Sequence, residues 1–489
     1  MSVPYDQPIA DVAHYVFHYK IDEADHTVWD RARTALLDAL GCAIETAATS
    51  TECGALLGPP IRGTTVPDGF RVPGTDLQVD PVEGAFDLGV LIRYLDHNDA
   101  LGGAEWGHPS DNLAAILAVM DWLSRASASG RYVHTGPPLT MRTLLSALIK
   151  AYEIQGCYQM SNSFNAYGID HVVLVKLASA AVVSWLLGLT EAQTMASISH
   201  VWMDGQPTRV YRSRGNTIPR KGWAAGDAAR RAVQMALYVR AGQPGAPEAL
   251  SAKRWGFWAR TFGEEGFEFP KAFGTWTIQN VLFKTMPVEG HAVSAVEATL
   301  LQLPHLKGTG LPNPVKQIDR IDLRTTAAAD LIINKSGPLY NAADRDHCIQ
   351  YVVALAFLKG SAPESVDYLD DSPWATSRDL TCLRQRIHVN PDPGFTQDYL
   401  NLEKKSIGAG LAVTLNDGSI IPEVVVEYPI GHVKHPRTNA VLGDKLLRNM
   451  AYMFSKTEAD RIAQAVRNDD LLVKDFVDLL TRPAIRSKF

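Results

Sequence analysis

Three things are scarce in this 489-residue sequence, and each scarcity excludes a class of protein. There are five cysteines, an odd number without a CxxC pair, so neither a disulfide framework nor an iron–sulfur cluster is expected. There is no excess of cations, and the net charge of −6 would repel nucleic acid. The most apolar run, residues 172–189, is short for a membrane span and contains Lys176, which indicates a buried core helix. We therefore expect a protein of a reducing compartment, with no nucleic-acid or membrane partner.

The N-terminal segment lacks the features of a targeting sequence. Acidic residues occur early and the first arginine is Arg31, so neither a secretory nor a mitochondrial presequence is indicated. The C-terminal Ser487-Lys488-Phe489 loosely matches the peroxisomal S-K-L signal, with a different last residue. The sequence thus predicts a cytoplasmic protein, and a peroxisomal location is the alternative.

The periodicity of the apolar residues divides the chain. From residue 28 to about 300 they recur at helical spacing, and the many small residues favour close helix packing. After about residue 310 the pattern alternates, and Asn416-Asp417-Gly418 between two alternating runs predicts a β-hairpin. Helical periodicity then returns. The sequence predicts a mainly α protein with a large helical domain at 1–285, an inserted smaller α+β domain at 286–432, and C-terminal helices at 433–489 that rejoin the helical domain.

The segment YLDHNDALGGAEWGHPSDN, residues 94–112, concentrates acids, histidines and glycines between two apolar runs. Apolar helical periodicity resumes after it, so a side chain of residues 110–112 is expected to cap a helix. His108 would then precede a helix N-terminus, whose free N–H groups and positive dipole suit a carboxylate ligand. Asp96 and Asp99 lie in the lead to this helix, where glycines let the backbone approach a ligand. The alternative is an acidic surface loop followed by a capped helix.

A cluster of cations occurs between Asp204 and Asp227 in a protein that is acidic overall; its members are Arg209, Arg212, Arg214, Arg220 and Lys221. Guanidinium groups bind carboxylates through paired hydrogen bonds, so the cluster is suited to hold a polycarboxylate. A solvated basic loop is the alternative. A phosphate or nucleic-acid site is disfavoured because no P-loop and no interleaved aromatic residues accompany the cations.

Three further side chains are candidates for a site, although each is also typical of a structural residue. They are His171, which opens the apolar run, and Lys284 and His291, which share one segment. His432 and His435 have a spacing that occurs in metal sites, but no carboxylate or cysteine is arranged with them. We therefore predict neither a metal site nor a cofactor.

The chain contains, in this order, the strings RVPGT, YLDHNDALGGAEWGHPSDN, EIQGC, NSFNAYGIDHVVLVK, RKGWAAGDA, NVLFK, GPLYNAADRDHCIQY and VVVEYPIGH. They extend over nearly the whole chain, and together they resemble the 2-methylcitrate dehydratases of the MmgE/PrpD family. The resemblance implies a large all-α domain with a smaller α+β lid domain and a homodimer. It also implies a metal-free active site between the two domains.

The resemblance also implies a reaction and a set of residues. The reaction is the dehydration of a 2-alkylcitrate to a 2-alkyl-cis-aconitate, which needs an acid, a base and charge stabilisation. The implied catalytic residues are Asp96, His108, His171, Lys221 and Lys284, and the substrate-binding residues are Asn98, Arg209, Arg212 and His291. The histidines would share the proton transfers and the lysines would hold carboxylates. A cis-aconitate decarboxylase, an iminodisuccinate epimerase and a non-catalytic tricarboxylate-binding protein are the alternatives.

The sequence departs from the family pattern beside this motif. Ala100 stands where a threonine is usual, and Gly102 and Gly103 stand where bulkier side chains are usual. These smaller side chains predict additional space beside the carboxylate site. Because each buried methylene contributes about 0.8 kcal/mol of binding, an alkyl chain longer than methyl is expected to compete as the substrate.

Overall fold

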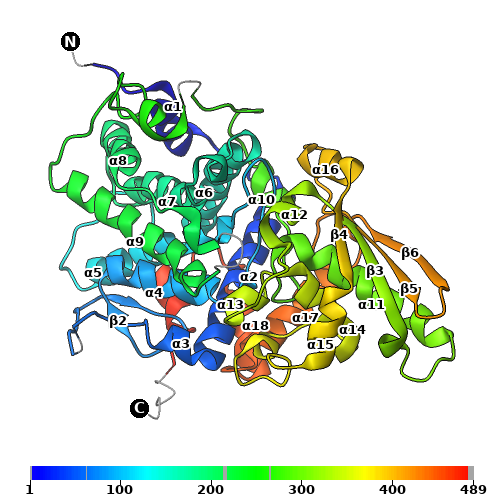
Figure 1. Cartoon of the computed structure of the whole chain (residues 1–489). Helices are drawn as coiled ribbons and strands as arrows, with labels where there is room; N and C mark the ends of the chain where they lie inside the picture. Colours follow the sequence, from blue (N-terminus) through cyan, green and yellow to red (C-terminus); the bar gives the residue numbers. More distant parts are fainter. Residues whose placement is uncertain (1–2, 62, 213–216, 264–265, 483–489) are drawn as a thin grey trace.

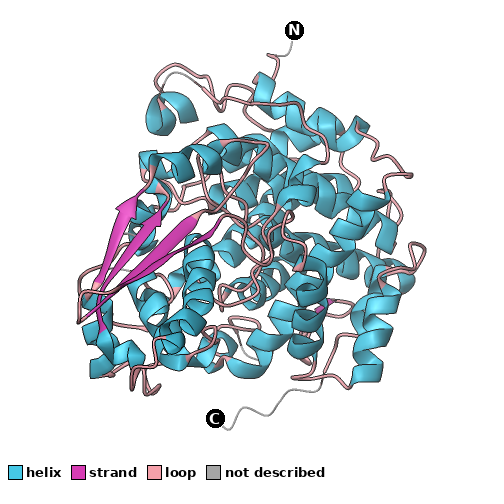
Figure 2. Cartoon of the chain, turned by 90° about the vertical axis from the view of Figure 1, so that its right-hand side faces the viewer, coloured by secondary structure: helices cyan, strands magenta, loops and turns pink. Residues whose placement is uncertain are grey.

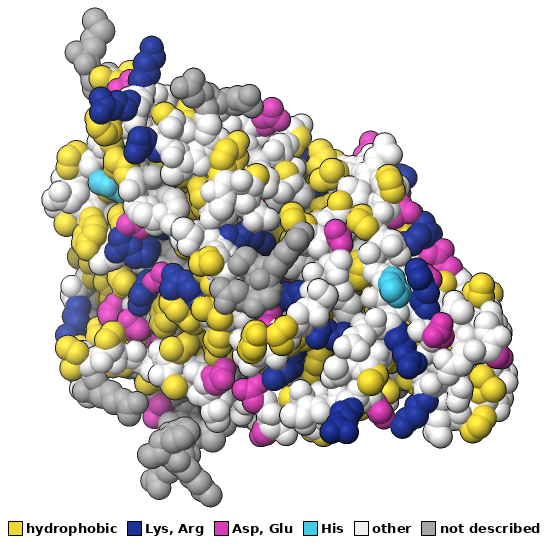
Figure 3. Space-filling view, in the orientation of Figure 1, with side chains coloured by type: hydrophobic (Ala, Val, Ile, Leu, Met, Phe, Trp, Pro, Cys, Tyr) yellow, Lys and Arg dark blue, Asp and Glu magenta, His cyan; other side chains and the backbone are white. Residues whose placement is uncertain are grey.

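The computed structural model describes residues 3–61, 63–212, 217–263 and 266–482. Within them the fold is mainly helical, as predicted, with a four-stranded sheet and a short two-stranded ribbon (Figure 2). Arg214 and the tripeptide Ser487-Lys488-Phe489, on which two sequence predictions depended, lie outside the described residues. On the face shown in Figure 3, cations and acids are interspersed over the surface.

The helices of the first part of the chain pack around one large hydrophobic core (Figure 1). Their apolar residues recur every three or four positions and so share one face, as Leu36, Leu40 and Ile44 do in α2. The helices are α1 (Gln7–His18), α2 (His26–Thr49), α3 (Thr51–Gly54), α4 (Pro81–Arg93), α5 (Leu113–Ala128), α6 (Met141–Ser161), α7 (Val172–Leu186), α8 (Glu191–Met203), α9 (Arg220–Arg240) and α10 (Trp276–Asn280). Strands β1 (Phe70–Arg71) and β2 (Gln78–Val79) form an antiparallel ribbon between α3 and α4.

Helix α7 lies inside this core, so the prediction of a buried helix in the most apolar run is confirmed. Lys176 is buried with the rest of the helix, and its Nζ donates to the carboxylate of Asp204 at 3.0 Å. Over the described part of the chain, no helix combines the length and the apolarity that a bilayer span requires.

A second hydrophobic core surrounds the larger sheet, whose strand order is β4-β3-β5-β6. Strand β3 (Ile318–Thr325) is parallel to β4 (Ile387–Pro391) and antiparallel to β5 (Ala409–Leu415), which pairs with β6 (Ile420–Val426). The turn between β5 and β6 contains Gly418 at φ 83°, which glycine adopts without steric cost, and the predicted hairpin is confirmed. The helices of this part are α11 (Val293–Gly308), α12 (Ala327–Ile333), α13 (Ala342–Arg345), α14 (Ile349–Lys359), α15 (Arg378–Gln385) and α16 (Pro393–Leu400), and α11 packs on β5 and β6.

The last helices pack on the first core. They are α17 (Thr438–Met450), α18 (Lys456–Ala465) and α19 (Val473–Asp478). Helix α17 contacts α2, and α19 contacts α5 (Figure 1). Met450, Ile462 and Phe476 belong to the same hydrophobic cluster as the helices of the first part. The two ends of the chain therefore stabilise one common core.

The segment before α5 differs from the prediction in its capping. It continues as a short 3₁₀ helix, Pro109–Asn112, and no side chain caps α5. Ser110 Oγ and Asp111 Oδ1 instead accept hydrogen bonds from Asn98 Nδ2, each at 2.9 Å. The predicted cap from residues 110–112 is wrong because these side chains tie the preceding loop to the start of the helix.

Candidate active site

Asp96 lies at the centre of a buried cluster of charges just after α4. Its φ of 53° is left-handed, a conformation that costs a non-glycine residue about 1–3 kcal/mol. Arg93 Nη1 and Lys284 Nζ both donate to its Oδ1, and Lys284 also donates to its carbonyl oxygen at 2.8 Å. Burial opposes ionisation, but the cations of Arg93, Lys284 and Lys221 outweigh it and hold the pKa of Asp96 well below its usual range. Asp96 is therefore an anion.

The donors of Lys284 are directed at the protein itself. Its third contact is the carbonyl oxygen of Val288 at 3.3 Å, and the side chain is fully buried. Burial lowers the pKa of Lys284, and Asp96 opposes that shift. Since an ammonium group has three donors, Lys284 is fully engaged in holding Asp96 in this arrangement.

Lys221, in the first turn of α9, joins Asp96 to a second acid. Its Nζ lies 2.6 Å from Asp346 Oδ2, 3.4 Å from Asp96 Oδ2 and 3.3 Å from His347 Nδ1. Asp346 and His347 directly follow α13, so elements of both hydrophobic cores meet at this lysine. Burial raises the pKa of Asp346, and Lys221 opposes that shift.

His108 is held in one tautomer. Its Nδ1 lies 2.6 Å from the carbonyl oxygen of Asp99. A carbonyl oxygen only accepts, so Nδ1 carries the hydrogen and Nε2 keeps a lone pair. Burial, followed by the cations of Arg93 and Lys284, lowers the pKa of His108 well below its usual range. The imidazole is therefore neutral, with a free basic nitrogen.

His171 faces His108 from the start of α7. The two ring centroids are 5.6 Å apart, and neither ring nitrogen of His171 has a hydrogen-bond partner among the described residues. Its Nδ1 lies 3.4 Å from Asp170 Oδ1. Burial lowers the pKa of His171 well below its usual range, although Asp170 opposes this. A buried imidazole without partners is available to a ligand.

Asp170 is paired with the two predicted substrate-binding arginines. Arg212 Nε donates to Asp170 Oδ2 at 2.7 Å, and Arg209 Nη1 lies 3.9 Å from the same oxygen. Burial opposes ionisation of Asp170, but Arg212, His171 and Arg209 outweigh it and lower its pKa. Arg209 also lies 3.5 Å from Glu105, and burial raises the pKa of Glu105 to about 7. These arginines are thus neutralised by internal acids that lie outside the basic stretch.

His291 and Asn98 are both bonded within the protein. His291 Nδ1 lies 3.0 Å from Glu289 Oε1, and its Nε2 lies 3.3 Å from the hydroxyl of Tyr399. Burial opposes ionisation of Glu289, but His291 outweighs it and lowers the pKa of Glu289 to about 2. The amide nitrogen of Asn98 donates to Ser110 in the 3₁₀ helix, whereas its Oδ1 has no partner among the described residues.

The five predicted catalytic residues form two groups. Lys221 and Lys284 contact Asp96, and the ring of His108 neighbours that of His171. Burial, followed by the cations of Arg93 and Lys284, lowers the pKa of His108, so the first group acts electrostatically on the second. The alternative of an acidic surface loop at 94–112 is wrong, because Asp96, Asp99 and His108 are buried. The alternative of a solvated basic loop is wrong for Arg212 and Lys221, which are buried as well.

Sequence reasoning missed several side chains that complete the cluster: Arg93, Asp170, Glu289, Asp346 and His347. Two signals were present. Asp170 directly precedes His171, and Asp346 with His347 lies in the string GPLYNAADRDHCIQY. Arg93 is the last residue of α4, and its pairing with Asp96, three positions later, depends on the left-handed turn that follows the helix.

The predicted extra space beside Ala100 is absent. A Cβ atom on Gly102 would lie 2.6 Å from the ring of Tyr399, and one on Gly103 would lie 2.6 Å from the carbonyl oxygen of Gln159. Ala100 is fully buried and pairs through its backbone with Leu282. The free volume beside these residues is about 10 Å³. The prediction was wrong because side chains and backbone distant in the sequence fill the space that the small residues leave.

A cavity of about 350 Å³ does adjoin the charged cluster, on the side of Lys221 and Asp346. It lies between the two parts of the chain, since its walls come from the end of α2, the residues after α4, the start of α9, and residues 341–346 and 365–371. Small-molecule sites have volumes of about 300–1,000 Å³, so the cavity is large enough for a ligand.

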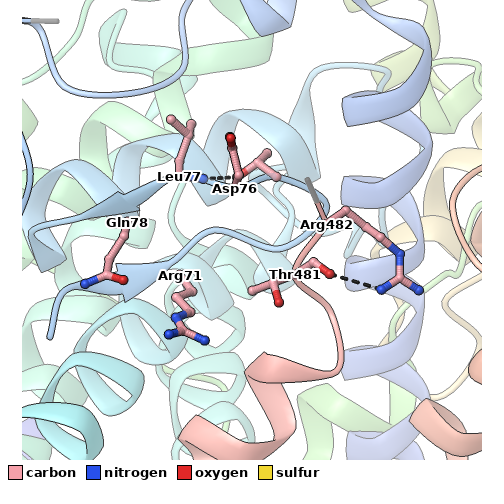
Figure 4. Close-up of a pocket in the computed structure, with 7 residues that line it drawn as sticks. Arg71, Asp76, Leu77, Gln78, Thr481 and Arg482 are labelled. Carbon is pink, nitrogen blue, oxygen red and sulfur yellow. Dashed lines mark hydrogen bonds between the residues drawn. The ribbon is translucent and has the colours of Figure 1, made fainter. Parts of the chain in front are cut away.

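A depression of about 330 Å³ lies elsewhere, beside the β1–β2 ribbon and the end of the described chain (Figure 4). None of the predicted site residues lines it. Arg71 there pairs with Asp478 at 2.8 Å, and Arg482 pairs with Glu458 at 2.6 Å. Both cations pair with acids, and no residue of the Asp96 cluster contributes to the depression, so it is separate from the candidate site.

Comparison with known proteins assigns the chain to a family. Residues 10–270 match the MmgE/PrpD N-terminal domain, and residues 286–471 match the MmgE/PrpD C-terminal domain. The chain belongs to the MmgE/PrpD family.

Several relatives are similar over nearly their full length. Alkylcitrate dehydratase phiI of a fungal species is 61% identical over 99% of this chain and 95% of that protein. Alkylcitrate dehydratase phiI of Talaromyces stipitatus is 55% identical over 98% of both chains. The 2-methylcitrate dehydratase of Escherichia coli K12 is 45% identical over 97% of both chains.

Proposed function

We propose that this protein is a carbon–oxygen lyase that dehydrates a 2-alkylcitrate to the corresponding 2-alkyl-cis-aconitate. The observation that carries the proposal is the pair of buried, neutral histidines, His108 and His171, beside the Asp96–Lys221 cluster. Dehydration needs one group that accepts a proton and another that donates one, with cations for the carboxylates. The relatives named above are dehydratases, which supports dehydration over decarboxylation or silent binding.

His108 is the base in this mechanism, because its tautomer leaves Nε2 unprotonated. The nitrogen takes the proton α to a carboxylate, the C–H electron pair forms the carbon–carbon double bond, and the adjacent C–O bond breaks. The leaving oxygen takes a proton from His171 and departs as water. The carboxylates of a bound substrate raise the pKa of His171, so that it is protonated only in the complex. Transfer of one proton through solvent then restores both histidines.

The charged residues hold the substrate and the acid–base pair in place. Lys221 binds a substrate carboxylate, exchanging its contact with Asp346 for the ligand. Lys284 pairs with Asp96, and the charge of Asp96 orients Lys221. Asp170 lies beside His171 and keeps its ring in place. Arg212 and Arg209 neutralise Asp170. We propose Asn98, through its unpartnered Oδ1, and His291, whose Nε2 lies 3.3 Å from the hydroxyl of Tyr399, as further substrate contacts.

The reaction is proposed to need no metal. Asp96, Asp346 and His347 offer ligand atoms within 4.8 Å of one another. Lys221 contacts all three, so a divalent cation would have to displace an ammonium group that already neutralises them. Activity should therefore survive exhaustive chelation. A complete loss that a divalent metal restores would contradict this assignment.

The family resemblance supports two further features, a homodimer and a lid at 286–432. The lid would close over the cavity between the two parts of the chain, and light scattering of the purified protein tests the dimer. The function itself is tested by incubating the protein with 2-methylcitrate and 2-hexylcitrate. We expect ultraviolet absorbance from a new conjugated double bond. Release of carbon dioxide from cis-aconitate without dehydration of either citrate would contradict the proposal.

A further inference from the structure

The cavity beside Lys221 has two chemically different ends. Lys221 and Asp346 form its buried inner end, to which Lys221 contributes an ammonium group. At the solvent side it is lined by the exposed acids Glu52 and Asp371, and by Asp370, which pairs with Arg345 at 2.7 Å. Carboxylates are attracted by the inner end and repelled by the outer one. A substrate that carries both carboxylates and an alkyl chain therefore enters with its carboxylates toward Lys221.

Part of the cavity wall is apolar. Leu95 and Pro219 line it from the helical part, and Val366 and Leu369 line it from the other part. Val366 is 54% exposed and Leu369 is 43% exposed, so two large apolar side chains face the same solvent-filled space. An alkyl chain that covered them would bury apolar area on both sides of the contact.

The cavity lining also contains a tyrosine with a buried hydroxyl. Tyr368 lines the cavity, is 3% exposed, and its hydroxyl has no hydrogen-bond partner among the described residues. An unsatisfied buried hydroxyl is costly, and a hydroxyl or carboxylate of a ligand would satisfy it. Tyr368 and Asp346 line the same cavity, and burial, followed by the charge of Asp346, raises the pKa of Tyr368.

We infer that this cavity is the subsite for the substrate's alkyl chain, with Val366 and Leu369 as the residues that select chain length and Tyr368 as the anchor of the polar head. The inference rests on the proposed dehydratase function. The alkyl chain then binds in this cavity and not beside Ala100, Gly102 and Gly103. The substrate of the protein then has an alkyl group longer than methyl.

The test measures kcat/KM for 2-hexylcitrate and for 2-methylcitrate in Val366→Asp and Leu369→Asp. Either substitution places a carboxylate in the path of the longer chain. We expect kcat/KM for 2-hexylcitrate, divided by kcat/KM for 2-methylcitrate, to fall about tenfold. This change corresponds to about 1.4 kcal/mol. Both positions are exposed, so the variants should fold, and thermal melting checks this. Leu331→Asp is the matched control, because Leu331 is 54% exposed in the same part of the chain but does not line the cavity.

A second comparison tests the polar anchor. Tyr368→Phe should raise KM for both citrates by about 2- to 10-fold, since one hydrogen bond contributes about 0.5–1.5 kcal/mol. Tyr351→Phe is the control: Tyr351 is also buried with an unpartnered hydroxyl, and its ring lies 6.3 Å from that of Tyr368, but it does not line the cavity.

The outcomes separate the subsite from the function. A ratio unchanged in both Asp variants, or an equal shift in Leu331→Asp, would overturn the subsite while the dehydratase function stands. Equal KM changes in the two tyrosine variants would overturn the anchor. A wild-type protein that dehydrates neither citrate would overturn the proposed function, and the subsite with it.

Discussion

Replacing Lys221 by methionine tests the charged cluster most directly. Methionine keeps much of the side-chain volume but removes the ammonium group that lies 2.6 Å from Asp346 and 3.4 Å from Asp96. Asp96 keeps Arg93 and Lys284, whereas His347 is the one remaining partner of the Asp346 carboxylate among the described residues. The substitution therefore leaves one buried carboxylate without a cation.

Two separate losses are expected from this change. Loss of one partner of a buried ion pair costs about 3–5 kcal/mol of unfolding free energy, because Lys221 is 2% exposed and solvent does not screen the orphaned charge. Loss of a charge-assisted contact to a substrate carboxylate costs about 1.5–3 kcal/mol, or roughly 10- to 150-fold in kcat/KM. Burial already raises the pKa of Asp346, and without Lys221 it rises further. The stability loss should therefore be smallest at low pH, where Asp346 is protonated, and should grow as the pH rises through this pKa.

Urea unfolding and steady-state kinetics measure the two effects on the same preparations. Lys176→Met is the control: Lys176 is also buried and bonded to a carboxylate, that of Asp204, which keeps Arg231 as a partner. We expect a smaller loss of stability there and an unchanged kcat/KM. Wild-type kcat/KM in folded Lys221→Met protein would refute the role of Lys221. An equal loss of kcat/KM in Lys176→Met would show that any buried lysine has this effect.

Three further predictions follow from the buried site and its surroundings. Substituting His108 or His171 by glutamine should lower kcat about 10²- to 10⁴-fold with little change in folding. If a variant keeps its kcat, the substituted histidine does not belong to the acid–base pair. Burial raises the pKa of Asp87 to about 8, so the stability it contributes is complete below its unfolded pKa of about 3.9 and is lost as pH rises through 8. Asp87→Asn should remove that fall in urea-unfolding free energy, and an unchanged pH dependence would contradict it. Gly103→Ala should cost about 1–3 kcal/mol of stability, since its Cβ would meet the carbonyl of Gln159. Gly443 lies in helix α17 with open space around it, so Gly443→Ala should instead stabilise the protein by about 0.5–1 kcal/mol. Equal shifts of the melting temperature in the two alanine variants would show that the space at residue 103 is free.

Local patterns alone predicted much of the fold. Helical spacing over residues 28–300, the alternating strands and the hairpin at Asn416-Asp417-Gly418 all depend on neighbours a few positions apart, which a sequence displays directly. The order of the family's strings was also sufficient to name the candidate residues Asp96 and His108. These predictions required no knowledge of which segments meet.

The partners of those residues depended on the tertiary structure. Lys284 reaches Asp96 across 188 positions and Lys221 reaches it across 125, and no local pattern encodes such pairs. The same reason explains the failed prediction at Gly102, whose missing side chain is replaced in space by Tyr399. A sequence shows which side chain is absent, but only the folded chain shows what occupies its place, because a densely packed interior is filled by residues distant along the chain.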